Sequence, residues 1–273
     1  MNYSFRQLQQ ILKNRKIFNL LLDLYCSGSP GFTPSRIAEP GDDKEINMQK
    51  GNLHPITQYT REVVEIFESL GFDVFEGPEV DNEWYNFDAL NVPSDHPARD
   101  VQDTFWLKDG RLLRTHTSNS QVRYTEKNKP PIKMIVPGRC YRNEATDSKH
   151  ETTFMQLEGL YIDKDVKIGH LFWTLETFLK KIYGDAIEVR FRPHHYPFVE
   201  PGMDVDIKYQ GKWLEVLGSG MVHPKVLRNM KIDPDKYSGY AFGLGIDRLV
   251  MLKYGIEDIR QLYSSDLRFL KQF

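Results

Sequence analysis

Apolar residues recur along this chain with spacings that predict several helices. From Ile56 to Leu70 and from Ile168 to Tyr183 they return every three or four residues, which is the period of a helix with one apolar face. Gly71 follows the first of these segments and is expected to end it. A third helix, opened by glycines, is predicted from Gly243 to Tyr254, and Phe5–Tyr25 suits one or two short amphipathic helices.

Other segments, with short runs of apolar and β-branched residues, are predicted to be strands. They are Lys133–Val136, Thr153–Ile162, Ile187–Pro193, Asp204–Tyr209 and Trp213–Val216, after an extended segment that begins at Phe72–Phe75. Because several strands follow one another with helices only at intervals, the order favours a mostly antiparallel sheet flanked by helices over a doubly wound parallel sheet. The predicted fold class is therefore α+β.

A change of composition predicts a domain boundary near residue 51. Residues 27–49 contain three prolines, three glycines and several charges without a sustained apolar period, which is typical of a linker. We therefore expect residues 1–50 to form a short helical appendage with a Pro/Gly-rich linker, and residues 51–273 to form one larger domain.

Composition and charge narrow the class of protein further. No apolar run reaches the roughly 18 residues that a membrane span requires, and the first residues lack a secretory signal, so a cytoplasmic protein is expected. Cys26 and Cys140 lie far apart and in no CxxC pair, which argues against a zinc site and a disulfide. The net charge is −2, so any contact with RNA must use a local patch or a partner subunit.

Residues 138–159 concentrate polar side chains on two predicted antiparallel strands joined by a loop at Thr146–Thr152. On a strand, alternate residues share a face, so Arg142 and Glu144 should point one way and Gln156 and Glu158 should also pair on one face. Arginine suits a phosphate or carboxylate, and the acidic and amide groups suit an amine. The competing interpretation is a solvated outer face with routine ion pairs.

Residues 238–255 carry spaced glycines before the third predicted helix. Glycines let a backbone approach a ligand closely, and a helix N-terminus attracts phosphate. Arg248 should lie one turn into this helix, near the same ligand. The same pattern also fits a nucleotide loop of another class or tight packing of a strand on a helix.

Several motifs together resemble the bacterial α subunit of phenylalanyl-tRNA synthetases, which are class II aminoacyl-tRNA synthetases. GRCYRNEATDSKHETTFMQLEG and SGYAFGLGIDRLVMLKYG are similar to motifs 2 and 3 of that class, with Arg142 and Arg248 as the motif arginines. HPITQYTREVVEIFESLGFDVFEGPEV resembles motif 1 of the α subunit. RTHTS, FRPHHYPFVEP, WLEVLGSGMVHPKVLRN and DLRFLKQF also resemble the α subunit, and the similarity runs from Leu53 to Phe273.

The resemblance implies that residues 51–273 are a catalytic domain that activates L-phenylalanine with ATP and Mg²⁺. Arg142 is implied to bind the α-phosphate and stabilise the transition state, and Glu144 and Arg248 to hold the bent ATP. The other implied contacts are His150, Gly243 and Gly245 for ATP; His116, Ser118, Gln156 and Glu158 for the ends of phenylalanine; Tyr196, Phe198 and Ala241 for its ring; and Glu215 for Mg²⁺.

Several of these residues also have a purely structural interpretation. Tyr196 and Phe198 could be core aromatics, and His116 a structural histidine with all of its hydrogen bonds made. Glu215 could form a structural ion pair, and His150 could be a solvated loop residue.

The resemblance also implies partners: a β subunit, in a heterotetramer of two α and two β chains, and tRNA(Phe). Fewer residues precede the catalytic domain than the family's helical hairpin needs, so the tRNA role of this end is in doubt. Tyr196 stands where Phe is common, and Asp247 where Glu is common. Two alternatives are a free-standing paralogue that makes an aminoacyl-adenylate for a non-tRNA acceptor, and a binding module without catalysis.

Overall fold

The computed structural model describes residues 51–99 and 103–273. The helices predicted within Phe5–Tyr25, the predicted linker and Cys26 lie outside the described residues. Cys140 lies within them, where it is a buried free thiol.

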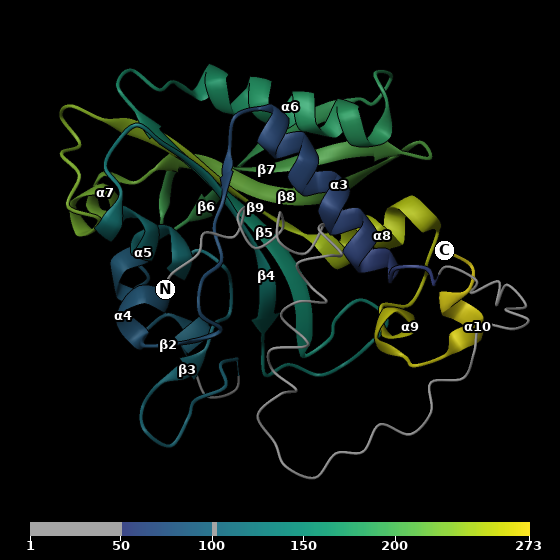
Figure 1. Ribbon diagram of the computed structural model, residues 1–273. Helices are drawn as coiled ribbons and strands as arrows, with labels where there is room; N and C mark the ends of the chain where they lie inside the picture. Colours follow the sequence, from purple (N-terminus) through teal and green to yellow (C-terminus); the bar gives the residue numbers. More distant parts are fainter. Residues whose placement is uncertain (1–50, 100–102) are drawn as a thin grey trace, which may run out of the picture. The chain divides into compact units, whose positions relative to one another are not determined.

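A seven-stranded sheet forms the centre of the described structure (Figure 1). In spatial order its strands are β1 (Asp73–Val74), β4 (Ile132–Tyr141), β5 (Thr153–Asp163), β9 (Ser238–Gly245), β8 (Lys212–Val222), β7 (Val199–Tyr209) and β6 (Val189–Tyr196). The pair β1–β4 is parallel, and every other neighbouring pair is antiparallel. A small second sheet pairs β2 (Val80–Asp81) with β3 (Leu112–Leu113).

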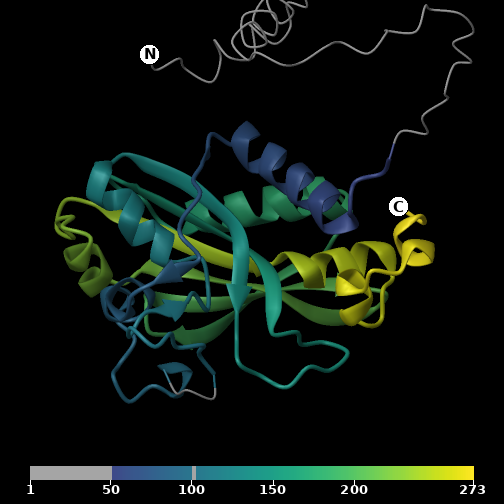
Figure 2. The same cartoon turned by 60° about the horizontal axis from the view of Figure 1, so that its bottom comes forward.

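Helices surround this sheet, and two long ones cover one of its faces. The helical segments are α3 (Pro55–Ser69), α4 (Glu83–Asn86), α5 (Asn119–Lys127), α6 (Ile168–Tyr183), α7 (Pro224–Asn229), α8 (Ile246–Tyr254), α9 (Arg260–Tyr263), α10 (Leu267–Leu270) and the 3₁₀ turns η1 (Asp88–Leu90) and η2 (Pro97–Arg99). Helices α3 and α6 lie side by side on the same face of the sheet (Figure 1, Figure 2). The start of α3 is favoured by Pro55 at its first turn and by the ring of His54, which accepts a hydrogen bond from a backbone amide.

A hydrophobic core fills the space between the sheet and helices α3 and α6. The rings of Phe67 in α3 and Phe178 in α6 stack with centroids 4.7 Å apart, and Phe67 also stacks on Phe242 of β9 at 5.1 Å. Leu157 of β5 packs into the same cluster. This core holds one face of the sheet rigidly, so only the opposite face is open to a ligand.

The opposite face carries a second core and, beside it, polar side chains. Leu160 and Ile162 of β5 belong to this core together with Ala241 of β9. Because alternate residues of a strand share a face, Glu158 of β5 and Gly243 of β9 point to this same side. These two residues are directly paired across the strands, which brings a carboxylate onto the open face.

The predicted α+β class and mostly antiparallel sheet are confirmed. The helix predicted from Ile168 to Tyr183 coincides with α6, and the one predicted from Ile56 to Leu70 differs from α3 by one residue at each end. The predicted strands are also found, and several extend beyond their predicted ends. Gly71, with a φ of 84°, follows α3 as expected.

Three local predictions were wrong at least in part. The helix predicted from Gly243 begins only at Ile246, with Gly245 as its N-cap, and Gly243 belongs to strand β9, where it pairs with Glu158 on one side and Gly218 on the other. The helix was also not the last one, since α9 and α10 follow it. Arg142 and Glu144 lie beyond the end of β4, so strand alternation does not explain their orientation.

Candidate active site

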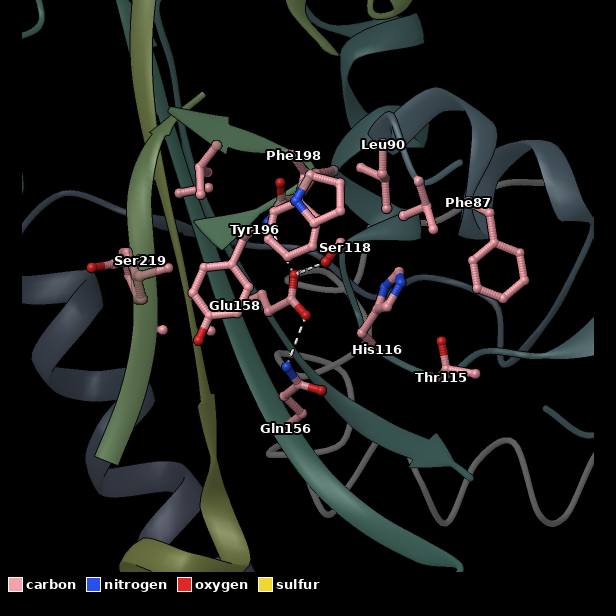
Figure 3. A pocket seen from close by; sticks show the side chains of 18 of the residues that line it. Phe87, Leu90, Thr115, His116, Ser118, Gln156, Glu158, Tyr196, Phe198 and Ser219 are labelled. Atoms are coloured by element: carbon pink, nitrogen blue, oxygen red, sulfur yellow. Dashed lines mark hydrogen bonds between the residues drawn. The ribbon is translucent and has the colours of Figure 1, made fainter. Parts of the chain in front are cut away.

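A cavity of about 820 Å³ lies on the open face of the sheet (Figure 3). Strands β5, β6, β8 and β9 contribute to its walls, together with the segment before α5 and the residues around η1. Most of the residues predicted to form a site line this cavity: His116, Ser118, Arg142, Glu144, Gln156, Glu158, Tyr196, Phe198, Glu215, Ala241 and Gly243. Residues far apart in the sequence therefore meet in one hollow.

Glu158 is a buried carboxylate at the centre of a hydrogen-bonded group (Figure 3). The Ser118 hydroxyl and Gln121 Nε2, at 3.2 Å, donate to one carboxylate oxygen, and Gln156 Nε2 donates to the other at 2.9 Å. Burial raises the pKa of Glu158 to about 7, although the hydrogen bond from Ser118 acts in the opposite direction. A bound ammonium group beside this carboxylate would stabilise its charged form.

Gly243 makes room for these polar side chains. A Cβ at this position would lie 3.1 Å from Glu158 Cγ and 3.2 Å from Gln156 Nε2. The glycine in the predicted motif therefore leaves space for the packing of two site residues within a strand.

His116 adds a neutral imidazole to the same end of the cavity. Burial lowers the pKa of His116 to about 3, and the charge of Arg142 acts in the same direction. The Nδ1 atom of His116 is buried and has no hydrogen-bond partner within residues 51–99 and 103–273. Because buried polar atoms are nearly always paired, this atom is suited to a ligand.

Arg142 follows the end of β4 and offers an exposed guanidinium to the cavity. Its Nε donates to the carbonyl oxygen of Thr115 at 3.3 Å, and its Cζ lies 4.8 Å from the centroid of the Phe154 ring. The backbone of Arg142 still pairs with Thr152, at 2.9 Å, beyond the last residue of the strand. Because Nε makes this contact, the other N–H groups of the guanidinium can bind an anionic ligand such as a phosphate.

An aromatic pair lines another part of the cavity. The rings of Tyr196 and Phe198 stack with centroids 5.6 Å apart and an angle of 20° between their planes. Ala241 contributes a small side chain to the same cavity, with apolar neighbours Leu90, Val199, Val222 and Val226. This part of the cavity is suited to an apolar group such as an aromatic ring.

Glu215 lies at the edge of the cavity with a half-exposed carboxylate. Arg192 Nη2 is 3.3 Å from Glu215 Oε2, and the carboxylate side chain is 54% exposed. No group of three or more His, Cys, Asp or Glu residues is arranged to hold a metal in the described part of the chain. A single accessible carboxylate fits Mg²⁺ only where phosphate oxygens and waters supply the other ligands.

Three predicted residues are not among those that line the cavity. Arg248 lies exposed in the first turn of α8, and Gly245 pairs with Gln156 at the end of β9. His150 lies in the loop between β4 and β5, where its ring is 3.0 Å from the carboxylate of Asp147. The structure therefore brings Arg142, Glu144, Gln156 and Glu158 of the motif-2 segment to the cavity and leaves these three residues beside or outside it.

Several cavity residues were not foreseen from the sequence. Gln121 donates to Glu158 from 37 residues away, and His194 and His195 lie near the end of strand β6 at the cavity wall. The only sequence signal for the histidines was their position directly before the aromatic pair. Gln121 gave no signal, because its role depends on how α5 packs beside β5.

Comparisons with known proteins agree with this geometry. The family model described as tRNA synthetases class II core domain (F) matches residues 43–273. Pyrrolysyl-tRNA synthetase from Desulfitobacterium hafniense has a similar fold, with a TM-score of 0.62 at 18% identity over 79% of this chain and 75% of that one. The chain therefore contains a class II synthetase core.

The curated relatives narrow this class. The phenylalanine–tRNA ligase alpha subunit of Caldicellulosiruptor saccharolyticus is 52% identical over 247 residues, which are 86% of this chain and 71% of that one. The subunits of the same name from Clostridium perfringens and Synechocystis are 52% and 51% identical, and the matches cover 72% and 68% of their lengths. The chain belongs to the family of phenylalanine–tRNA ligase alpha subunits. Within residues 51–99 and 103–273, no helix is both long and apolar enough to cross a membrane.

Proposed function

We propose that this chain activates L-phenylalanine with ATP and transfers the phenylalanyl group to tRNA(Phe), as the α subunit of a phenylalanyl-tRNA synthetase. The observation that carries the proposal is one cavity that combines a buried carboxylate, an exposed arginine and an aromatic wall. These groups match the ammonium, the phosphate and the ring of the reactants. The free-standing paralogue is not favoured, because the curated relatives at about half identity are α subunits.

The first step of the reaction, formation of phenylalanyl-adenylate, depends on alignment of the reactants and stabilisation of charge more than on acid–base chemistry. Glu158, with Gln156 and Ser118, holds the α-ammonium group, and the Tyr196 and Phe198 rings hold the side chain. A carboxylate oxygen of phenylalanine then attacks the α-phosphorus of ATP, the bond to the β-phosphate oxygen breaks, and pyrophosphate leaves. The products are phenylalanyl-adenylate and pyrophosphate.

Arginine charge stabilises the transition state of this displacement. Arg142 binds the α-phosphate oxygens as negative charge grows on them, and Glu144 orients the nucleotide beside it. Arg248, Gly243, Gly245 and His150 are proposed to contact ATP once it is bound. His116 presents its neutral ring to the amino-acid carboxylate, and Ala241 leaves space for the phenyl group.

The site fits Mg²⁺ through Glu215, whose accessible carboxylate lines the cavity. When bound, the ion neutralises charge on the phosphates of ATP. The role of Glu215 itself is to hold a negative charge at that edge of the cavity, with Arg192 beside it.

The second step transfers the activated amino acid. A terminal ribose hydroxyl of tRNA(Phe) attacks the adenylate carbonyl carbon, and AMP leaves with the bonding electron pair.

We propose that residues 51–273 form the catalytic domain and residues 1–50 an appendage. We further propose that the chain assembles with a β subunit as two α and two β chains, and that it works in the cytoplasm.

The test is phenylalanine-dependent exchange of pyrophosphate into ATP by the full chain co-purified with its β subunit. The exchange should be lost in Arg142→Ala and retained in Arg139→Ala, since Arg139 is exposed on the same segment but does not line the cavity. Charging of tRNA(Phe) should follow the same pattern. A wild-type complex without exchange would refute the proposed function.

A further inference from the structure

The Tyr196 hydroxyl is held by a buried carboxylate that lies behind the cavity wall. Tyr196 Oη donates to Asp204 Oδ1 at 2.8 Å, and the Asp204 side chain is only 3% exposed. Asp204 belongs to β7 and is not among the residues that line the cavity. In Figure 3 the hydroxyl points away from Phe198 and Leu90, so it lies outside the apolar part of the cavity.

Gly218 makes this arrangement possible. A Cβ on Gly218 would lie 2.7 Å from the Tyr196 hydroxyl oxygen and 3.0 Å from Tyr196 Cζ. The phenol therefore lies directly on the backbone of β8, in space that any side chain would occupy. With the hydroxyl placed on one side by Gly218 and bonded on the other by Asp204, the ring has little freedom to turn.

The other oxygen of Asp204 is also occupied, which fixes the acceptor itself. Arg192 Nη2 and His194 Nδ1 each lie 3.2 Å from Asp204 Oδ2, so Oδ1 remains for the tyrosine. Burial and the neighbouring Asp204 raise the pKa of Tyr196 well above its usual value, so the phenol keeps its proton and remains a donor.

We propose that Asp204 is a positioning residue of the amino-acid pocket: by accepting the Tyr196 hydroxyl, it fixes the ring that contacts the substrate side chain. The inference rests on the proposed function, because it assigns the aromatic wall to phenylalanine. Loss of the bond frees the ring to rotate, and the substrate must then order it on binding. The cost falls on phenylalanine affinity, because it is the amino-acid side chain that the ring contacts.

The molecule offers a matched control in Asp206. It lies two residues further along β7, its side chain is 2% exposed, and it also binds Arg192, at 2.7 Å. Arg190 is the second partner of Asp206, and the Tyr196 hydroxyl is bonded to Asp204 and not to Asp206. Removing the charge of Asp206 disturbs β7 to a similar degree but leaves the hydrogen bond between Tyr196 and Asp204 in place.

The experiment measures phenylalanine affinity by calorimetry, and kcat with both KM values by pyrophosphate exchange, in the complex of the full chain with its β subunit. Asp204→Val and Tyr196→Phe should each raise the phenylalanine Kd by up to about tenfold, the cost of ordering one freed side chain on binding. In Tyr196→Phe, which leaves Arg192 and Glu215 in place, the KM for ATP should change less than twofold. Asp204→Asn, which keeps an acceptor oxygen, should lose less, and Asp206→Asn should bind phenylalanine like the wild type.

The double variant separates positioning from general damage. If the two residues act through one bond, Tyr196→Phe with Asp204→Val should bind phenylalanine no more weakly than the worse single variant. Multiplied effects in the double variant, an unchanged Kd in Tyr196→Phe, or an equal loss in Asp206→Asn would overturn the inference. If Asp204→Val does not fold, the phenylalanine Kd values of Tyr196→Phe and Asp204→Asn still test the inference. A wild-type complex that performs no exchange refutes the proposed function instead.

Discussion

Replacing Glu158 with glutamine should strengthen the fold and weaken the site at the same time. The carboxyl group has a pKa of about 7 in the folded protein because it is buried, against an ordinary value of 4.5. Between these two pH values the folded protein keeps a proton that the unfolded chain has lost. The free energy of unfolding therefore falls as the pH rises through this window, and the loss is complete above pH 7.

The magnitude follows from the size of the shift. A difference of about 2.5 pKa units corresponds to about 3 kcal/mol of stability that the wild type lacks at pH 8 and regains near pH 4.5. Glu158→Gln resembles the protonated carboxyl group, so it should be more stable than the wild type by up to about 3 kcal/mol at pH 8 and equal to it at about pH 4. Urea unfolding at the two pH values measures the difference.

The same substitution should remove the partner of the substrate ammonium group. A lost hydrogen bond between charged groups costs about 2–3 kcal/mol, so the phenylalanine Kd should rise roughly 30- to 150-fold at pH 8. In the wild type, only the ionised fraction of Glu158 binds the ammonium, so the Kd should rise about tenfold between pH 8 and pH 6. Calorimetry on the complex measures both effects.

Two results would refute this reasoning. One is a wild-type phenylalanine Kd that stays constant from pH 6 to pH 8 while Glu158→Gln binds equally well, since the carboxylate then plays no part in binding. The other is a glutamine variant that is less stable than the wild type at pH 8, which would mean that the hydrogen bonds to Glu158 outweigh its burial. Gln121→Glu is a useful contrast, because it adds a second buried carboxylate beside the first and should destabilise the fold.

Three further substitutions test other parts of the structure. Gly243→Ala should displace Glu158 and Gln156, and so raise the KM for phenylalanine in pyrophosphate exchange. Phe67→Ala should cost about 3–5 kcal/mol in urea unfolding, because it empties the core between α3 and the sheet. Asp247→Ala should lower stability by about 1–3 kcal/mol in the same assay, because it removes a buried acceptor for a tyrosine hydroxyl and a backbone amide.

The elements that the sequence predicted well are those whose pattern is local. Helix α6 was predicted to the residue, because its apolar face repeats over sixteen positions and a glycine follows it. Residues Gly243 to Gly245 were predicted to open a helix but end strand β9, because their extended form depends on β5 and β8, which pair with this strand from both sides. Glycine weakens a strand on its own, so only that pairing explains why Gly243 and Gly245 are extended.

The candidate site was likewise predictable from the sequence only in part. The resemblance of short motifs identified Glu158 and Arg142, and the structure brings both to one cavity. What the sequence did not indicate was the environment that determines their chemistry. The raised pKa of Glu158 depends on burial by distant segments, and the Tyr196–Asp204 bond depends on the bare backbone of Gly218 on a third strand.

The two faces of the sheet separate stability from function. On the face that packs against α3 and α6, stacked phenylalanine rings and aliphatic side chains provide the core. On the other face, a buried carboxylate and the unpaired Nδ1 of His116 lower stability until a ligand meets them. Since burial of an unmatched charge is unfavourable, such groups are best explained by the substrate that matches them. A Glu158→Gln variant that is more stable than the wild type but inactive would show directly that this carboxylate lowers stability and serves substrate binding.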